Sequence, residues 1–197
     1  MAAVRRTATL TLVAAVLAGC GGGGSSSASY RGSKPPADLK LPDFSLRDQA
    51  GSLVRSKNLE GKVVLVTFLD SACREACPPA AVEIGRAVRM LTPEQRGDVV
   101  ALAISVDPRV DSPARVRAFL RRGHADGELK FLLGTVRQLR PVWNAFHILP
   151  AVDSGDSDVH TILVEIYDRD GTWVSSMHTG VDLNAANVRH DLVTALS

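Results

Sequence analysis

Residues 62–69 read Lys62-Val63-Val64-Leu65-Val66-Thr67-Phe68-Leu69, an apolar run rich in β-branched side chains and without strict polar alternation. This pattern predicts a strand that is buried on both faces in a parallel sheet. After a short turn, residues 73–78 read Cys73-Arg74-Glu75-Ala76-Cys77-Pro78 and lead into a helical stretch. We therefore expect two thiols at the point where a core strand passes into its helix.

The two thiols are four residues apart, which in a helix places their side chains roughly 5–6 Å from each other. That separation permits a disulfide, and it also permits both thiolates to bind one soft metal ion such as Cu(I). A disulfide that encloses three residues constrains little of the unfolded chain, so reactivity explains the spacing better than stability does. The helix N-terminus favours the thiolate form of Cys73, and we expect the pair to be reactive and at least partly exposed.

Strand-like and helix-like segments alternate along the rest of the chain. Pro78-Pro79 and Ser112-Pro113 carry the signals of helix starts, because proline is tolerated in the first turn and serine caps it. The expected elements are a hairpin at 44–46 and 53–54, strands at 62–69, 98–106, 160–167 and 172–177, a short apolar segment at 130–133, helices that begin at 78 and 113, and helices at 136–146 and 184–196.

The predicted order is β-α-β-α, then an extra helix, then β-β-α. Right-handed crossovers make the first two long strands parallel, and the closing hairpin pairs beside them. The sequence thus predicts an α/β, thioredoxin-like fold: a central mixed sheet flanked by helices, with an N-terminal β-hairpin extension and one inserted helix. The fold alone does not determine the function.

The first nineteen residues have the pattern of an export signal. Arg5 and Arg6 form a basic start, residues 7–17 are uncharged and mostly apolar, and Leu17-Ala18-Gly19-Cys20 follows. Such a run is too short to span a membrane as a helix. The ending resembles the bacterial lipobox, which implies cleavage before Cys20 and lipidation of that cysteine; an ordinary signal peptide is the alternative. We expect a lipoprotein signal at 1–19 and a lipid anchor at the extracytoplasmic face of the bacterial cell membrane.

Residues 20–40 are rich in glycine, serine and proline, and this composition predicts a flexible spacer between the lipid and the domain. Residues 41–197 are long enough for one domain with an adequate core. The leader carries two of the 23 basic residues and no acidic residue, so the mature chain has 21 of each sign. A formally neutral domain gives no electrostatic reason to expect nucleic acid as a partner.

Several segments from residue 41 to the C-terminus resemble the Sco/SenC family of exported copper-binding proteins. Cys73, Cys77 and Pro78 match the family's Cys-x-x-x-Cys-Pro motif, and Val159-His160-Thr161 stands where the family places its ligand histidine. The other segments in register are Pro42-Asp43-Phe44-Ser45-Leu46-Arg47-Asp48 with Gly51, Gly61 to Phe68, Ser105-Val106-Asp107-Pro108, Asp111-Ser112-Pro113, Leu133-Gly134 and Trp143.

The resemblance implies a copper chaperone that takes part in assembly of the CuA centre of cytochrome c oxidase. Copper, as Cu(I) or Cu(II), would be bound by Cys73, Cys77 and His160, since two thiolates suit Cu(I) and an added imidazole suits Cu(II). The implied partner is the oxidase subunit that carries CuA, or another copper or thiol protein, and the chain is expected to be a monomer. Two features depart from the family: the run Arg74-Glu75-Ala76 between the cysteines, and the order Asp158-Val159-His160 where Val-Asp-His is frequent.

A second interpretation uses the same residues for redox chemistry, as a thiol:disulfide oxidoreductase in which Cys73 attacks and Cys77 resolves. Thioredoxin-type reductases generally have a two-residue gap between the cysteines and a proline before the neighbouring strand. Here the gap is three residues and Val159 precedes His160, which favours a metal site. A redox or copper sensor would also use these residues. A peroxiredoxin is disfavoured, because Asp70 stands where that class has serine or threonine.

Other polar side chains have ordinary explanations beside functional ones. Met177-His178 pairs a soft ligand with an imidazole and could assist copper binding, although a surface position is the preferred interpretation. His124 and His190 are expected to face solvent. Asp107 and Asp111 are expected to cap turns or a helix start, with a role in orienting loops near the site as the alternative.

Overall fold

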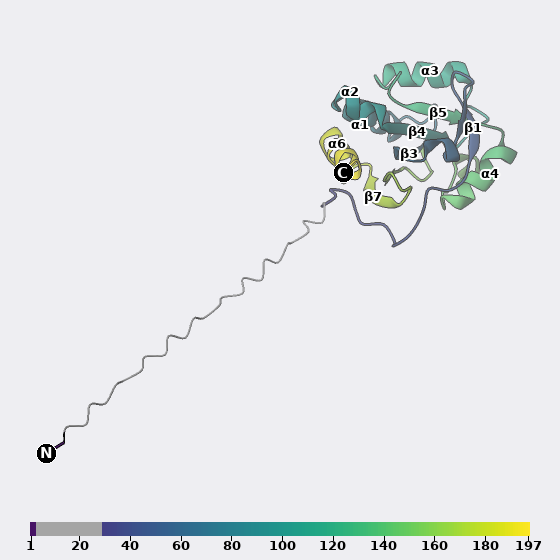
Figure 1. Cartoon of the computed structure of the whole chain (residues 1–197). Coiled ribbons are helices and arrows are strands. Elements are labelled where there is room, and N and C mark those ends of the chain that lie inside the picture. The colour runs from purple at the N-terminus through teal and green to yellow at the C-terminus, as the bar shows by residue number, and fades with distance from the viewer. Residues whose placement is uncertain (3–28) are drawn as a thin grey trace.

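The computed structural model describes residues 1–2 and 29–197 of the chain (Figure 1). The predicted lipidation site at Cys20 lies outside these residues, as do most of the predicted signal and the first part of the predicted spacer. In the described part of the chain, seven strands form one sheet in the order β2-β1-β5-β4-β3-β6-β7. No helix among these residues has the length and apolar character that crossing a bilayer requires.

The elements follow the predicted order with two additions: the apolar segment at 130–133, not predicted as a strand, forms one, and short helices lie between the predicted elements. The strands are β1 (Ser45–Asp48), β2 (Leu53–Arg55), β3 (Val63–Leu69), β4 (Val99–Ser105), β5 (Lys130–Leu133), β6 (Leu163–Tyr167) and β7 (Trp173–His178). The helices are the 3₁₀ turn η1 (Ser56–Leu59), α1 (Cys77–Arg89), α2 (Pro93–Gly97), α3 (Pro113–Arg122), α4 (Val136–Ala145), α5 (Ala151–Ser154) and α6 (Ala185–Ala195).

The sheet is mixed, as the sequence predicts. β3 runs parallel to β4, and β4 runs parallel to β5. On its other side, β3 pairs with β6 in the antiparallel direction, and β7 closes that edge. β1 and β2 form the expected N-terminal hairpin, which joins the sheet antiparallel to β5. The prediction of a central mixed sheet flanked by helices, with a hairpin extension, is therefore confirmed.

Strand β3 lies at the centre of two hydrophobic clusters, and all of its residues are buried. Val63, Leu65 and Leu69 pack with α1, α3 and α6, whereas the apolar residues between them pack with α4 and the N-terminal hairpin. Figure 1 shows helices on both sides of the sheet. Burial on both faces explains why residues 62–69 have no polar alternation.

The chain contacts the domain from Tyr30, which packs against the core cluster inside the segment predicted to be a flexible spacer. The backbone N–H groups of Arg31 and Gly32 donate to the buried Asp191 carboxylate of α6 at 2.7 and 3.0 Å. A Cβ on residue 32 would lie 2.2 Å from Ser175 Oγ, so glycine permits this close approach. The domain therefore begins before the predicted boundary at residue 41, because α6 supplies an acceptor that local composition does not reveal.

The last long strand begins later than predicted. β6 starts at Leu163, whereas the sequence predicts a strand from His160. The intervening Thr161 pairs with the segment that follows α4 instead of with β3, since its N–H donates to the Leu149 carbonyl at 3.0 Å. His160 consequently lies on a loop, and its position depends on what holds that loop.

Candidate metal centre

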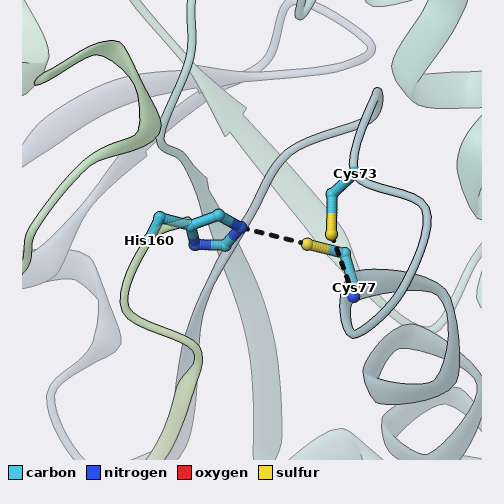
Figure 2. Close-up of side chains that lie close together, drawn as sticks. All are labelled: Cys73, Cys77 and His160. Atoms are coloured by element: carbon cyan, nitrogen blue, oxygen red, sulfur yellow. Dashed lines mark hydrogen bonds between the residues drawn. The ribbon is translucent and has the colours of Figure 1, made fainter. Parts of the chain in front are cut away.

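The cysteine loop, residues 70–76, connects β3 to α1. Asp70 shapes it: the Ala72 N–H donates to the Asp70 side chain at 2.6 Å, and the Cys73 N–H donates to the Asp70 carbonyl at 3.3 Å. Helix α1 then begins at Cys77 with prolines in its first turn, where a missing N–H breaks no helical bond. The Cys77 N–H donates to Cys73 Sγ at 3.2 Å, and Figure 2 shows the two thiols side by side.

His160 reaches this pair from the histidine loop, residues 155–162, which connects α5 to β6. Its Nε2 lies 3.2 Å from Cys77 Sγ, and its Nδ1 lies 3.0 Å from the Thr161 carbonyl oxygen (Figure 2). Because a carbonyl oxygen only accepts, Nδ1 carries a proton. In the neutral ring Nε2 then keeps its lone pair directed at the sulfurs, as a metal ligand requires.

The structure brings the three predicted ligands together. The ligand atoms of Cys73, Cys77 and His160 all lie within 4.8 Å of one another. Both cysteines are free thiols in this structure. Two sulfurs and one imidazole nitrogen form a donor set that suits soft and borderline metal ions such as copper. The three residues thus fit a metal chemically, and their role as ligands stays a prediction.

The expectation that the cysteines are partly exposed is wrong. Cys73 is 4% exposed and Cys77 is fully buried, and both sulfurs belong to the hydrophobic cluster beneath α1. The polar neighbours Arg74 and Glu75 are exposed instead, so the cysteine and the polar side chains of this segment lie on opposite sides of the backbone. Half-buried His160 is therefore the most accessible of the three predicted ligands.

The cysteine pair is electrostatically asymmetric. A hydrogen bond from the Cys77 thiol lowers the pKa of Cys73 to about 5, against the opposing effect of burial and with help from His160. The same hydrogen bond, together with burial, raises the pKa of Cys77. Burial disfavours the charged form of His160, but the nearby Cys73 thiolate outweighs it and raises the pKa of the ring. At neutral pH the site holds one thiolate, the form of cysteine that can bind a metal ion or act as a nucleophile.

A chain of buried hydrogen bonds supports the cysteine loop from behind. The Ser71 N–H donates to the Asp111 carboxylate at 2.8 Å, and the Ser105 hydroxyl donates to the same carboxylate at 2.6 Å. The Trp143 indole N–H in turn donates to the Ser105 carbonyl at 2.8 Å. Asp111 therefore orients the loop, and the preferred prediction of simple capping is wrong for it; Ser112 caps α3 instead.

The remaining polar residues singled out in the sequence lie elsewhere. Met177 is buried in the core, whereas the neighbouring His178 is exposed at the end of β7. His124 is exposed, as predicted. His190 is partly exposed, and its ring also contacts the Asp191 carboxylate at 2.9 Å. Asp107 caps the turn that follows β4 by accepting from the Arg109 N–H at 3.0 Å, as predicted.

Glu165 of β6 is a buried acid that sequence reasoning missed, because a single charged residue in a strand is usually assigned to a solvated face. It is 2% exposed and accepts a hydrogen bond from the Tyr167 hydroxyl at 2.6 Å. Burial raises its pKa from 4.5 to about 7. The folded state therefore keeps a proton that the unfolded state releases between these two pH values.

We expect the contribution of Glu165 to the free energy of unfolding to fall by roughly 2–4 kcal/mol as pH rises from about 4.5 to above 7, since its folded pKa is the higher one. This contribution is the difference in pH dependence between the parent and the Glu165→Gln variant, which should be more stable than the parent at pH 8. Urea unfolding at pH 5 and pH 8 measures both effects. Glu60→Gln, at an exposed position, should keep the parent's pH dependence; an equal fall in all three proteins would contradict the assignment.

The chain is similar in sequence to known proteins. Residues 32–197 match the sequence model of the family described as SCO1/SenC. An SCO2-like protein of Rickettsia conorii is 26% identical over 144 residues, which cover 69% of this chain and 68% of that protein.

Solved structures share the same fold. Bradyrhizobium japonicum ScoI, whose structure has copper bound, matches with a TM-score of 0.65 at 30% identity over 80% of this chain and 100% of that chain. BsSco matches with a TM-score of 0.67 at 23% identity over 83% of this chain and 97% of that chain. BsSco is described as a member of the Sco family of cytochrome c oxidase assembly proteins with a disulfide switch. The predicted thioredoxin-like fold is thus confirmed.

Proposed function

We propose that this chain, which belongs to the SCO1/SenC family, is a copper metallochaperone that binds its metal through Cys73, Cys77 and His160. The observation that carries the proposal is the convergence of two sulfurs and one imidazole nitrogen within 4.8 Å. These atoms come from the cysteine loop, the first residue of α1 and the distant histidine loop, so their meeting is a property of the fold. The copper-bound relative from Bradyrhizobium japonicum supports copper as the metal.

The donor set suits copper in both of its common oxidation states. Two thiolates are strong ligands for Cu(I), and the imidazole extends the set toward Cu(II). Copper here is cargo that the chain takes up and hands over. Burial of both sulfurs leaves the His160 side as the route by which an acceptor would reach the metal.

We further propose that the chain acts at the extracytoplasmic face of the membrane, anchored by lipid on Cys20, and delivers copper to the CuA-bearing subunit of cytochrome c oxidase. The leader pattern that ends in Leu-Ala-Gly-Cys supports the anchor. The description of BsSco as an oxidase assembly protein supports the client.

The second candidate function is thiol:disulfide exchange by the same cysteine pair. The lowered pKa of Cys73 favours it, because a thiolate beside a second thiol is the arrangement that such chemistry uses. Metal-free protein that turns over a disulfide substrate rapidly, without tight copper binding, would favour this candidate over the first.

Removal of the imidazole tests the metal site. We expect His160→Ala to weaken Cu(II) binding by at least about 10–100-fold, the cost usual for a residue that merely supports a metal ligand. Titration of the reduced chain with Cu(I) and Cu(II), followed by competition with a chelator, measures this. His178→Ala removes an exposed histidine at the same end of the sheet and should bind copper as the parent does. Unchanged Cu(II) binding by His160→Ala would overturn the assigned site.

A further inference from the structure

We propose that Asp158 is a positioning residue that fastens the histidine loop to the cysteine loop and thereby sets the place of His160 beside the two sulfurs. This inference rests on the proposed metal site and adds a residue to it that is not a ligand. Asp158 stands two residues before His160, and its side chain reaches across to the opposite loop.

The contact joins the two loops at the segment between the cysteines. One carboxylate oxygen of Asp158 accepts the Arg74 N–H at 2.8 Å and the Glu75 N–H at 3.3 Å. Both donors lie in the three-residue gap that separates Cys73 from Cys77, immediately before α1 begins. Both residues precede the N-cap Ala76, so the helix offers their N–H groups no acceptor, and the Asp158 carboxylate supplies one.

The histidine loop has few other contacts that could fix it. On the far side of His160, Thr161 is tied to Leu149 by two hydrogen bonds, of 3.0 and 3.1 Å. On the near side, Val159 is 51% exposed and cannot anchor the loop by burial. The Asp156 carboxylate accepts the Asp158 N–H at 2.9 Å, which forms a turn immediately before Asp158. His160 is therefore held between one anchor after it and one before it, and Asp158 is the anchor before it.

The positioning role requires a hydrogen-bond acceptor at residue 158. It does not require a negative charge or a bond from Asp158 to the metal. Asparagine keeps an oxygen at the same place and can accept both N–H groups, whereas alanine offers none. Asp153 provides a matched control, since it is an exposed acid just before the histidine loop whose carboxylate pairs with Arg140 rather than with the cysteine loop.

The test uses the reduced full chain and its Asp158→Ala, Asp158→Asn, Asp153→Ala and His160→Ala variants. Cu(II) affinity is measured by chelator competition, and the copper environment by visible absorption and electron paramagnetic resonance. We expect Asp158→Ala to bind Cu(II) about three- to tenfold more weakly, the effect of a hydrogen bond or two. Its spectra should shift toward those of His160→Ala. Asp158→Asn and Asp153→Ala should retain the parent's affinity and spectra.

The outcomes separate this inference from the function on which it rests. If His160→Ala alters Cu(II) binding and Asp158→Ala does not, the positioning role is wrong and the metal site stands. If Asp158→Asn is as weak as Asp158→Ala, or if Asp153→Ala is equally weak, charge rather than hydrogen bonding is responsible, and the inference fails. If no variant, His160→Ala included, changes Cu(II) binding, the proposed site itself is wrong.

Discussion

Replacing Cys77 with serine is expected to abolish tight Cu(I) binding, with an affinity loss of more than about 100-fold. The reason is that residues which only support a metal ligand already cost about 10–100-fold when they are removed, and Cys77 is assigned as a ligand itself. Serine keeps the size of the side chain but replaces a soft sulfur with a hard oxygen, which Cu(I) does not favour. Cys73→Ser should give a loss of the same order. Competition for Cu(I) with a chromophoric chelator measures both.

A neighbouring substitution controls for damage to the loop. The Ser71 hydroxyl is buried and has no hydrogen-bond partner among the described residues, so Ser71→Ala changes the cysteine loop without removing a ligand or a contact. It should bind Cu(I) as the parent does and unfold at a similar temperature. Tight Cu(I) binding by the Cys77→Ser variant, or an equal loss in Ser71→Ala, would contradict the assignment of the two sulfurs as ligands.

The largest loss of stability is expected for Trp143→Ala, at about 4 kcal/mol. Trp143 is fully buried in the cluster beneath α4, and its indole N–H donates to the Ser105 carbonyl at 2.8 Å. Alanine would leave a cavity and an unsatisfied buried carbonyl group. For a domain of this size the melting temperature should fall by roughly 8–16 °C. Thermal and urea unfolding of the metal-free protein measure the change.

A phenylalanine at the same position divides the effect into its parts. Trp143→Phe keeps most of the apolar volume but loses the N–H, so we expect it to cost about 1–3 kcal/mol, the penalty for an unpaired buried group. Because Ser105 also donates to Asp111, and Asp111 accepts from the Ser71 N–H, both variants should loosen the cysteine loop. A Trp143→Ala variant with the parent's stability would show that this cluster does not hold the fold together.

The fold could be predicted from sequence because its strongest signal is local. An uninterrupted apolar run specifies a central strand, and β3 is buried on both faces as that run requires. The start of α1 could also be predicted, since proline is favoured in the first turn of a helix. The short helix α2 was not predicted, although Thr92 and Gln95 form a capping box, which is a recognisable sequence signal for a helix start.

The site was only partly predictable, because its geometry depends on contacts between distant segments. Motif spacing identified the cysteines and the resemblance identified His160, but the burial of both sulfurs and the late start of β6 follow from tertiary packing. Asp111 and Asp158 belong to the same class: each carboxylate accepts N–H groups from a loop at least 40 positions away in the sequence. Local sequence patterns do not predict such a contact.

X-ray absorption spectroscopy of the copper-loaded chain identifies the metal ligands directly, because it counts the atoms around the metal. For Cu(II)-loaded protein we predict two sulfur scatterers and one imidazole nitrogen in the first shell, and the imidazole signal should vanish in the His160→Ala variant. A shell of oxygen and nitrogen alone, or one that is unchanged in His160→Ala, would contradict the assignment of Cys73, Cys77 and His160 as the copper site.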